Sequence, residues 1–141
     1  MNILISACLL GQYCRYDGQT KVYPQVQALI GRDDIHLIPV CPEQCGGLAT
    51  PRPAAERQGK RVVTANGSDV TAQYQRGAEA ALYWARLFHC TKAILKEKSP
   101  SCGHGQIYDG TFSRTLTAGD GVTAELLRAE GLEIIGESDL P

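Results

Sequence analysis

Three cysteines that are far apart in the sequence each follow a short apolar segment. Cys8 ends the run NILISAC, Cys41 ends the run HLIPVC, and Cys102 lies in KEKSPSCGHG just after the run AIL. Thiolates bind soft metals and iron–sulfur clusters, and they are also effective nucleophiles. If these three side chains meet, they predict a metal or cluster site, or an enzyme that uses a reactive thiol.

The total of six cysteines has two general explanations, which depend on the compartment. In a secreted chain an even number suggests disulfides. The N-terminal stretch MNILISACLLG resembles a lipoprotein signal, but no Lys or Arg precedes Cys8 and the apolar segment is too short for a signal core. We therefore expect a cytoplasmic protein with reduced thiols, in which clustered cysteines favour metal binding or catalysis.

The apolar pattern predicts strands and helices in alternation along one domain that spans residues 1–141. The hydrophobic content of 43% is enough for a buried core. The expected elements are strands at 2–8, 36–41, 92–96 and 132–136, helices at 22–31, 70–88 and from an Asp120 N-cap to a Gly131 C-cap, a loop at 42–60 and a small hairpin at 61–71. This order predicts an α/β fold with a mainly parallel sheet of about four strands and helices on both faces.

A parallel sheet of this kind would bring the three cysteines together. Ligands bind beyond the carboxyl ends of the strands in such folds. Cys8, Cys41 and Cys102 all lie at or just beyond a predicted carboxyl end, so we expect them at one edge of the sheet. The alternative for each single cysteine is a small buried apolar side chain, which is the role we expect for Cys90 at the end of a helix.

The number of thiols leaves the kind of site open. A structural zinc ion usually has four ligands, so a zinc-bound module would need Cys14 or Cys45 in addition to the three. A 4Fe-4S cluster usually has four cysteine ligands, and with three of them one iron stays open. A cofactor-free enzyme with Cys102 as nucleophile is a third reading, but no histidine is evidently paired with it.

Several polar residues adjoin the predicted thiol site. Glu43 lies two residues after Cys41, where a carboxylate could act as a general base or remain a solvated loop residue. Ser99 and Ser101 precede Cys102, and such hydroxyls also stabilise turns. Arg52 in the stretch TPRP could bind an anionic substrate group or pair with a carboxylate such as Glu56.

Four longer stretches of the chain resemble one known family. SACLLGQYCRYDG, PVCPEQCGGLATPRPAAE, KEKSPSCGHGQIYDGTFS and AGDGVTAELLRAEGLEII are similar to the bacterial thiouracil desulfidases. The resemblance implies a Rossmann-like three-layer sandwich that binds an oxygen-sensitive 4Fe-4S cluster through Cys8, Cys41 and Cys102. It also implies acid/base roles for Glu43 and Ser99, and we assign substrate contacts to Ser101 and Arg52.

The family reaction would be a non-redox hydrolysis of thiolated uracil to uracil and sulfide. The resemblance implies that the thiocarbonyl sulfur binds the open iron while a water activated by a glutamate attacks the carbon. The net charge of −1 gives no strong signal for nucleic acid, and no segment suggests a membrane. We therefore expect thiouracil, or its nucleoside or nucleotide, as a small-molecule partner, and leave open a homodimer and the zinc-bound module.

Overall fold

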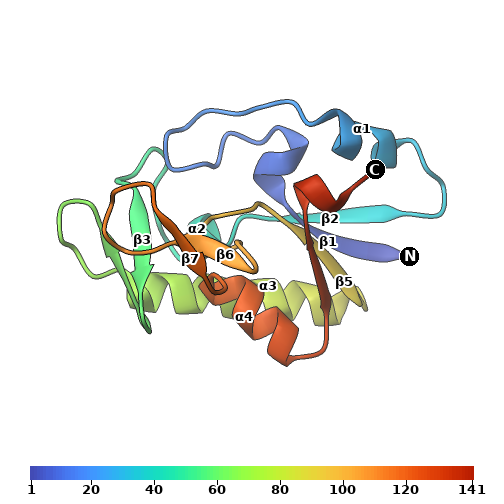
Figure 1. Cartoon of the computed structure of the whole chain (residues 1–141). Helices are drawn as coiled ribbons and strands as arrows, with labels where there is room; N and C mark the ends of the chain where they lie inside the picture. The colour runs from blue at the N-terminus through green and yellow to red at the C-terminus, as the bar shows by residue number, and fades with distance from the viewer.

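A four-stranded parallel sheet forms the centre of the protein in the computed structural model, which describes residues 1–141 (Figure 1). Its strand order is β2-β1-β5-β8, and all three neighbouring pairs are parallel. The strands are β1 (Asn2–Ser6), β2 (His36–Val40), β5 (Lys92–Leu95) and β8 (Glu133–Gly136). The predicted α/β class with four parallel strands is therefore confirmed.

The two central strands are buried on both faces, which explains their continuous apolar sequences. Leu4 of β1 packs in the larger apolar cluster, whereas Ile3 and Ile5 pack in a second cluster on the opposite face. In β5, Leu95 and Ile94 divide in the same way. Because side chains alternate along a strand, one short apolar run supplies the cores of both layers.

Helices cover both faces of the sheet, as predicted. Figure 1 shows α3 and α4 on one side and α1 on the other. The helical segments are η1 (Ala7–Leu10), α1 (Pro24–Ile30), α2 (Pro42–Cys45), α3 (Thr71–Leu87), α4 (Val122–Ala129) and η2 (Glu137–Asp139). No helix has the length and apolar character that crossing a bilayer requires. The long helix α3 contributes Ala81, Leu82 and Ala85 to the larger cluster.

Two small antiparallel ribbons lie outside the main sheet. They are β3 (Ala55–Gln58) with β4 (Arg61–Thr64), and β6 (Gln106–Tyr108) with β7 (Leu116–Ala118). Figure 1 shows the second ribbon beside β3, and these two ribbons contact each other through β3 and β6. Together they form a wall beyond the carboxyl edge of the sheet.

The segment expected as a loop at 42–60 is partly regular, so that prediction was wrong in two places. It contains α2 and β3, and β4 pairs with β3 rather than within 61–71. Around the Asn-Gly turn only one isolated bridge forms, between Val63 and Asp69. The N-cap of the last helix is Gly121 instead of Asp120, whose carboxylate accepts a hydrogen bond from the Gly105 amide.

Candidate active site

A cavity of about 470 Å³ opens at the carboxyl edge of the sheet. Residues from the segments that follow β1, β2 and β5 line it, together with residues of the two ribbons. They include Ser6, Cys8, Cys14, Arg15, Cys41, Glu43, Glu56, Lys96, Lys98, Ser99, Cys102, Tyr108, Phe112 and Arg114. A cavity of this size is typical of a small-molecule site.

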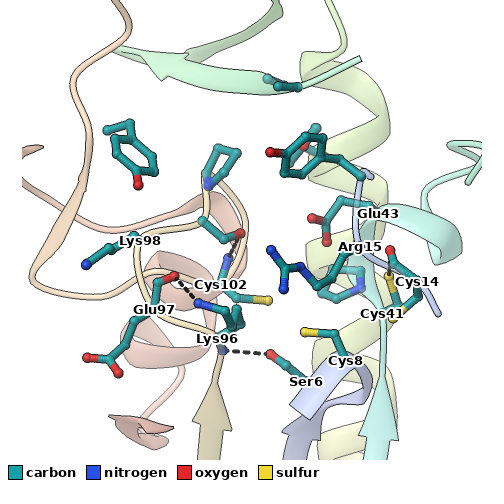
Figure 2. Close-up of a pocket in the computed structure, with 18 of the residues that line it drawn as sticks. Ser6, Cys8, Cys14, Arg15, Cys41, Glu43, Lys96, Glu97, Lys98 and Cys102 are labelled. Carbon is teal, nitrogen blue, oxygen red and sulfur yellow. Dashed lines mark hydrogen bonds between the residues drawn. The ribbon is translucent and has the colours of Figure 1, made fainter. Parts of the chain in front are cut away.

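The three cysteines singled out in the sequence all line this cavity. Cys8 lies in η1 directly after β1, Cys41 directly follows β2, and Cys102 lies in the loop after β5. Figure 2 shows the Cys8 and Cys102 side chains pointing into the same space, with Cys41 on the side of Cys8. The parallel order of β2, β1 and β5 places these thiols at one edge because neighbouring strands end there together.

A hydroxyl group ties the ends of β1 and β5 together at this edge. The Oγ atom of Ser6, at the end of β1, accepts a hydrogen bond of 2.9 Å from the Lys96 amide (Figure 2). Ser6 is 2% exposed, so the bond is shielded from water. It holds the segments that carry Cys8 and Cys102 in a fixed relation.

A fourth thiol, Cys14, lies beside Cys8 and Cys41. The hydrogen bond with Cys14 lowers the pKa of both Cys8 and Cys41, while the pKa of Cys14 is raised because it serves as the donor. The carbonyl of Cys14 also accepts the Cys41 thiol at 3.7 Å (Figure 2). Cys14 is therefore a direct neighbour of two of the predicted ligands.

The loop that carries Cys102 is fixed by the Ser99 hydroxyl. Ser99 Oγ accepts hydrogen bonds of 3.0 Å from the amides of Ser101 and Cys102. Both lone pairs of this oxygen are then occupied, which leaves its O–H group free to donate. Cys102 itself is 3% exposed, and burial raises its pKa well above the ordinary value.

Glu43 is held by a buried arginine. Arg52 Nη2 lies 3.5 Å from Glu43 Oε2 and donates to the carbonyl of Cys14 at 3.0 Å. Arg52 Nη1 donates to the carbonyl of Ala49 and the hydroxyl of Thr50. The two ionic side chains are 6% and 15% exposed. Burial raises the pKa of Glu43 although the positive charge of Arg52 works in the opposite direction.

The short helix α2, which begins next to Cys41 and carries Glu43, packs directly on α3. A Cβ atom added at Gly77 of α3 would lie 2.0 Å from the Pro42 carbonyl oxygen, and one added at Gly46 would lie 2.0 Å from the Gln73 carbonyl oxygen. Two glycines therefore allow the backbones to approach closely. This contact fixes the position of α2, and with it the positions of Cys41 and Glu43 at the edge of the sheet.

Four basic side chains line the cavity beside its apolar and acidic residues. Arg15, Lys96, Lys98 and Arg114 line it, and Figure 2 shows the Arg15 guanidinium directed toward the space between Glu43 and the thiols. The pKa of Lys96 is raised: burial alone would lower it, but Glu137 of η2 lies 3.0 Å away and outweighs burial. The C-terminal segment thus supports one wall of the site.

Neither of the two predicted substrate residues lines this cavity. The hydroxyl of Ser101 is fully buried and bonds Thr123 at 2.8 Å, and Arg52 pairs with Glu43 rather than with Glu56. Their substrate contacts stay predictions. Cys90 packs in the larger apolar cluster.

Sequence reasoning pointed to the Tyr108 ring as a surface for a flat ligand, and Tyr108 lines the cavity, but it missed the cavity residues of the turn at 109–115. Phe112 and Arg114 line the cavity, and both have a positive φ, 57° and 59°. Nothing in their types marks them as functional. The only sequence signal is the Tyr-Asp-Gly turn at 108–110, which predicts a bend but not its position over the thiols.

The thiol arrangement can be compared with the needs of a metal or a cluster. No group of three or more His, Cys, Asp and Glu side chains is placed to hold one metal ion. A single zinc ion requires all its sulfurs within about 2.3 Å of one centre, whereas a cubane binds each thiolate through a different iron and spans more space. Cys8, Cys41 and Cys102 line one cavity from three separate segments, and cysteine thiolates are the usual ligands of such a cluster.

Comparison with known proteins agrees with this geometry. The model of a family described as 2-thiouracil desulfurase matches residues 3–139. The chain belongs to this family. The uncharacterized protein YbbK of Bacillus subtilis (strain 168) is 42% identical over 148 residues, which cover 98% of this chain and 97% of YbbK.

A solved structure is also similar over almost the whole chain. It is the [4Fe-4S]-dependent thiouracil desulfidase TudS, with a TM-score of 0.91 and 51% sequence identity. The match covers 99% of this chain and 93% of that chain. This likeness agrees with the Rossmann-like sandwich expected from the resemblance of the sequence.

Proposed function

We propose that this protein is an iron–sulfur-dependent thiouracil desulfidase. The observation that carries the proposal is the meeting of Cys8, Cys41 and Cys102 at one open cavity, in a member of the desulfurase family that is 51% identical to a [4Fe-4S]-dependent desulfidase. A zinc-bound structural module is not favoured, because neither the family nor this similar structure is of that kind.

The three cysteines are proposed as the ligands of a 4Fe-4S cluster. Each comes from a different segment that follows a strand of the sheet. Cys14 also lines the cavity, but it lies within the loop beyond η1 and follows no strand directly. When bound with three ligands, the cluster supplies an open, soft iron that suits the sulfur of a thiocarbonyl. The similar structure, a [4Fe-4S]-dependent enzyme, supports the presence of such a cluster.

Glu43 is proposed as the general base. It is the carboxylate nearest in sequence to a ligand, it lines the cavity, and Arg52 fixes its orientation. Desulfuration by hydrolysis needs a water molecule that loses a proton as it attacks the thiocarbonyl carbon. A carboxylate that burial has made more basic accepts that proton more readily.

Ser99 is proposed as the hydrogen-bond donor to the substrate. Its oxygen already accepts two amides, so its remaining capacity is the O–H group. Such a donor stabilises negative charge that develops on a ring atom when water attacks. Because two amides already donate to its oxygen, we assign this serine the role of a donor to the substrate and not of an acceptor.

The substrate is proposed to be thiouracil, its nucleoside or its nucleotide. Arg15, Lys98 and Arg114 in the cavity suit an anionic group such as a phosphate.

The protein is proposed to be cytoplasmic, because reduced thiols and an oxygen-sensitive cluster favour that compartment.

The test is an anaerobic assay of purified protein. The protein should be brown, contain about four iron and four sulfide per chain as a 4Fe-4S cluster requires, and release sulfide and uracil in equal amounts from 2-thiouracil or 4-thiouracil. Zinc instead of iron, or an iron-loaded protein that releases no sulfide from any thiolated uracil, base or nucleotide, would refute the proposal.

A further inference from the structure

A second carboxylate in the cavity wall, Glu56, has no role in the reaction proposed above. It lies in the middle of β3 opposite Val63 of β4. The residue is 9% exposed and it lines the cavity. Carboxylates this deeply buried are rare unless they are paired or hydrogen-bonded.

One oxygen of Glu56 fixes the turn that covers the cavity. Glu56 Oε1 accepts the amide of Gly110 at 3.0 Å and the amide of Phe112 at 3.1 Å. Phe112 and Arg114 have backbone angles in the left-handed region, which non-glycine residues adopt at a cost. The two hydrogen bonds therefore hold a strained turn in place over the site, and we call residues 109–115 the roof.

The other oxygen of Glu56 is available to a ligand. Oε2 makes no hydrogen bond within the chain, and no Lys, Arg or His side chain forms an ion pair with Glu56. Thr20 Oγ1 is the one fully buried polar side-chain atom without a partner, so Glu56 Oε2 retains accessible surface. Glu56 also lines the cavity, so a ligand bound there lies next to this side chain.

We propose that Glu56 is a substrate-binding residue with two functions, one for each oxygen. Oε1 holds the roof closed, and Oε2 accepts a hydrogen bond from an N–H or O–H donor of the ligand. This inference rests on the proposed function, which supplies two sources of such a donor: the ring N–H groups of a uracil and the hydroxyls of a ribose. A carboxylate there rejects ligands that present only acceptors, because two acceptors leave both groups unpaired.

The Glu56→Gln variant separates the two functions. Its amide oxygen can still accept both roof amides, and its NH₂ group then faces the ligand as a donor where an acceptor is needed. Glu56→Ala removes both functions. Glu125→Gln is the matched control, since Glu125 is an exposed carboxylate that bonds Arg57 and does not line the cavity.

Hydrogen exchange on cluster-free protein tests the roof without any turnover. In Glu56→Ala the amides of Gly110 and Phe112 should lose protection by about 10-fold or more, the scale for losing a hydrogen bond to a charged group. In Glu56→Gln and Glu125→Gln they should exchange as in the wild type. Unchanged protection in a folded Glu56→Ala protein would overturn the roof function.

Binding of uracil and uridine, which carry no sulfur, tests the second oxygen in cluster-loaded protein. Glu56→Gln should weaken binding by about 10-fold or more, while Glu125→Gln leaves it within two-fold. If wild-type protein binds 1-methyluracil or 3-methyluracil more weakly than uracil, and Glu56→Gln does not, a ring N–H is the donor. If wild-type protein instead binds only 2′-deoxyuridine more weakly than uridine, a ribose hydroxyl is the donor.

These outcomes are distinct from a failure of the proposed function. If wild-type protein desulfurates thiouracil and Glu56→Gln binds uracil and uridine as tightly as the wild type does, the inference is wrong and the function stands. If Glu56→Gln also opens the roof, the second function is tested on wild-type protein alone. Wild-type protein that binds 1-methyluracil, 3-methyluracil and 2′-deoxyuridine as tightly as uracil and uridine would overturn it. If no thiolated uracil is desulfurated, the function itself fails.

Discussion

At the scale of single residues, neighbouring groups occupy most of the hydrogen-bonding capacity of the side chains that form the site. The Ser99 oxygen is occupied by two amides, and Arg52 is occupied by two carbonyls, a hydroxyl and the Glu43 carboxylate. Each side chain keeps one function because its other hydrogen-bonding capacity is spent. The consequences can be tested one residue at a time.

The Glu43→Gln variant should keep the cluster and lose most of its turnover. Glutamine has the shape and reach of the native side chain but cannot take a proton from water. We expect kcat to fall by about 100-fold or more, the usual scale for a positioned base. The measurement is anaerobic turnover of thiouracil at matched iron content. A kcat within a few-fold of the wild type would shift the base role to another group.

The Arg52→Gln variant should lower kcat by about 10-fold or more, because it frees the Glu43 carboxylate to rotate away from the water. Arg52→Lys should recover part of this loss, since it keeps the charge although not the planar fork. Both variants are to be compared at equal iron content and with thermal melts. If both variants lose the same share of kcat, and that share matches their loss of iron, the role of Arg52 is purely structural.

At the scale of secondary structure, the glycine contact between α2 and α3 sets the position of Cys41 and Glu43. A glycine within a helix usually gains about 0.5–1 kcal/mol of stability on substitution by alanine. At Gly77 the new methyl group would meet the Pro42 carbonyl oxygen at 2.0 Å. We therefore expect alanine at this position to lower the stability of the protein instead of raising it.

Gly77→Ala should destabilise the protein by about 1–3 kcal/mol, as overpacking does. Gly31→Ala is the control, because Gly31 follows α1 with φ −83° and has no atom within 4 Å of an added Cβ. Urea denaturation of both variants measures the free energy of unfolding. If Gly77→Ala is as stable as Gly31→Ala, the close approach of the two helices is not required for folding.

The elements that carry the thiols could be predicted because they follow simple patterns. The run before Cys8 is apolar and buried, the run before Cys41 is apolar although its strand lies at the edge of the sheet, and α3 has a clear helical period. The helix α2 was missed because Pro42 and two following glycines suggested a loop, although proline favours the first turn of a helix. The strands β6 and β7 have three residues each, too few for a period to be recognised.

Side-chain pairing within the site could not be predicted from the sequence. Arg52 and Glu43 lie nine positions apart, and both Glu43 and Glu56 were available to Arg52 until α2 and β3 had been placed. In the same way, Glu56 reaches Gly110 only because β3 lies beside β6. These contacts depend on tertiary structure, whereas the cysteines could be found because each follows a strand.

At the scale of the whole molecule, the core shares only Cys102 with the proposed cluster ligands. The two main apolar clusters pack on opposite faces of the sheet, and Leu4, Ile5, Ile94 and Leu95 are all at most 1% exposed. The cavity lies beyond this core, at the edge of the sheet. Folding should therefore not require the cofactor.

Removal of iron with a chelator should leave a folded protein. We expect the far-UV circular dichroism spectrum to be preserved and thermal unfolding to stay cooperative. The Tm should be lower than in the loaded protein, because a ligand bound only to the native state adds stability. A spectrum of a random coil after chelation would show that the cluster is part of the folding core.

The central claim is that Cys8, Cys41 and Cys102 hold one cluster on which desulfuration depends. The direct test compares Cys102→Ser with Cys90→Ser, since both cysteines are buried but only Cys102 lines the cavity. Iron and sulfide content and anaerobic turnover of thiouracil are measured on both folded proteins. We predict that Cys102→Ser loses the cluster and all turnover while Cys90→Ser keeps both. An active Cys102→Ser protein with a full cluster, or a folded Cys90→Ser protein without one, would contradict the assignment.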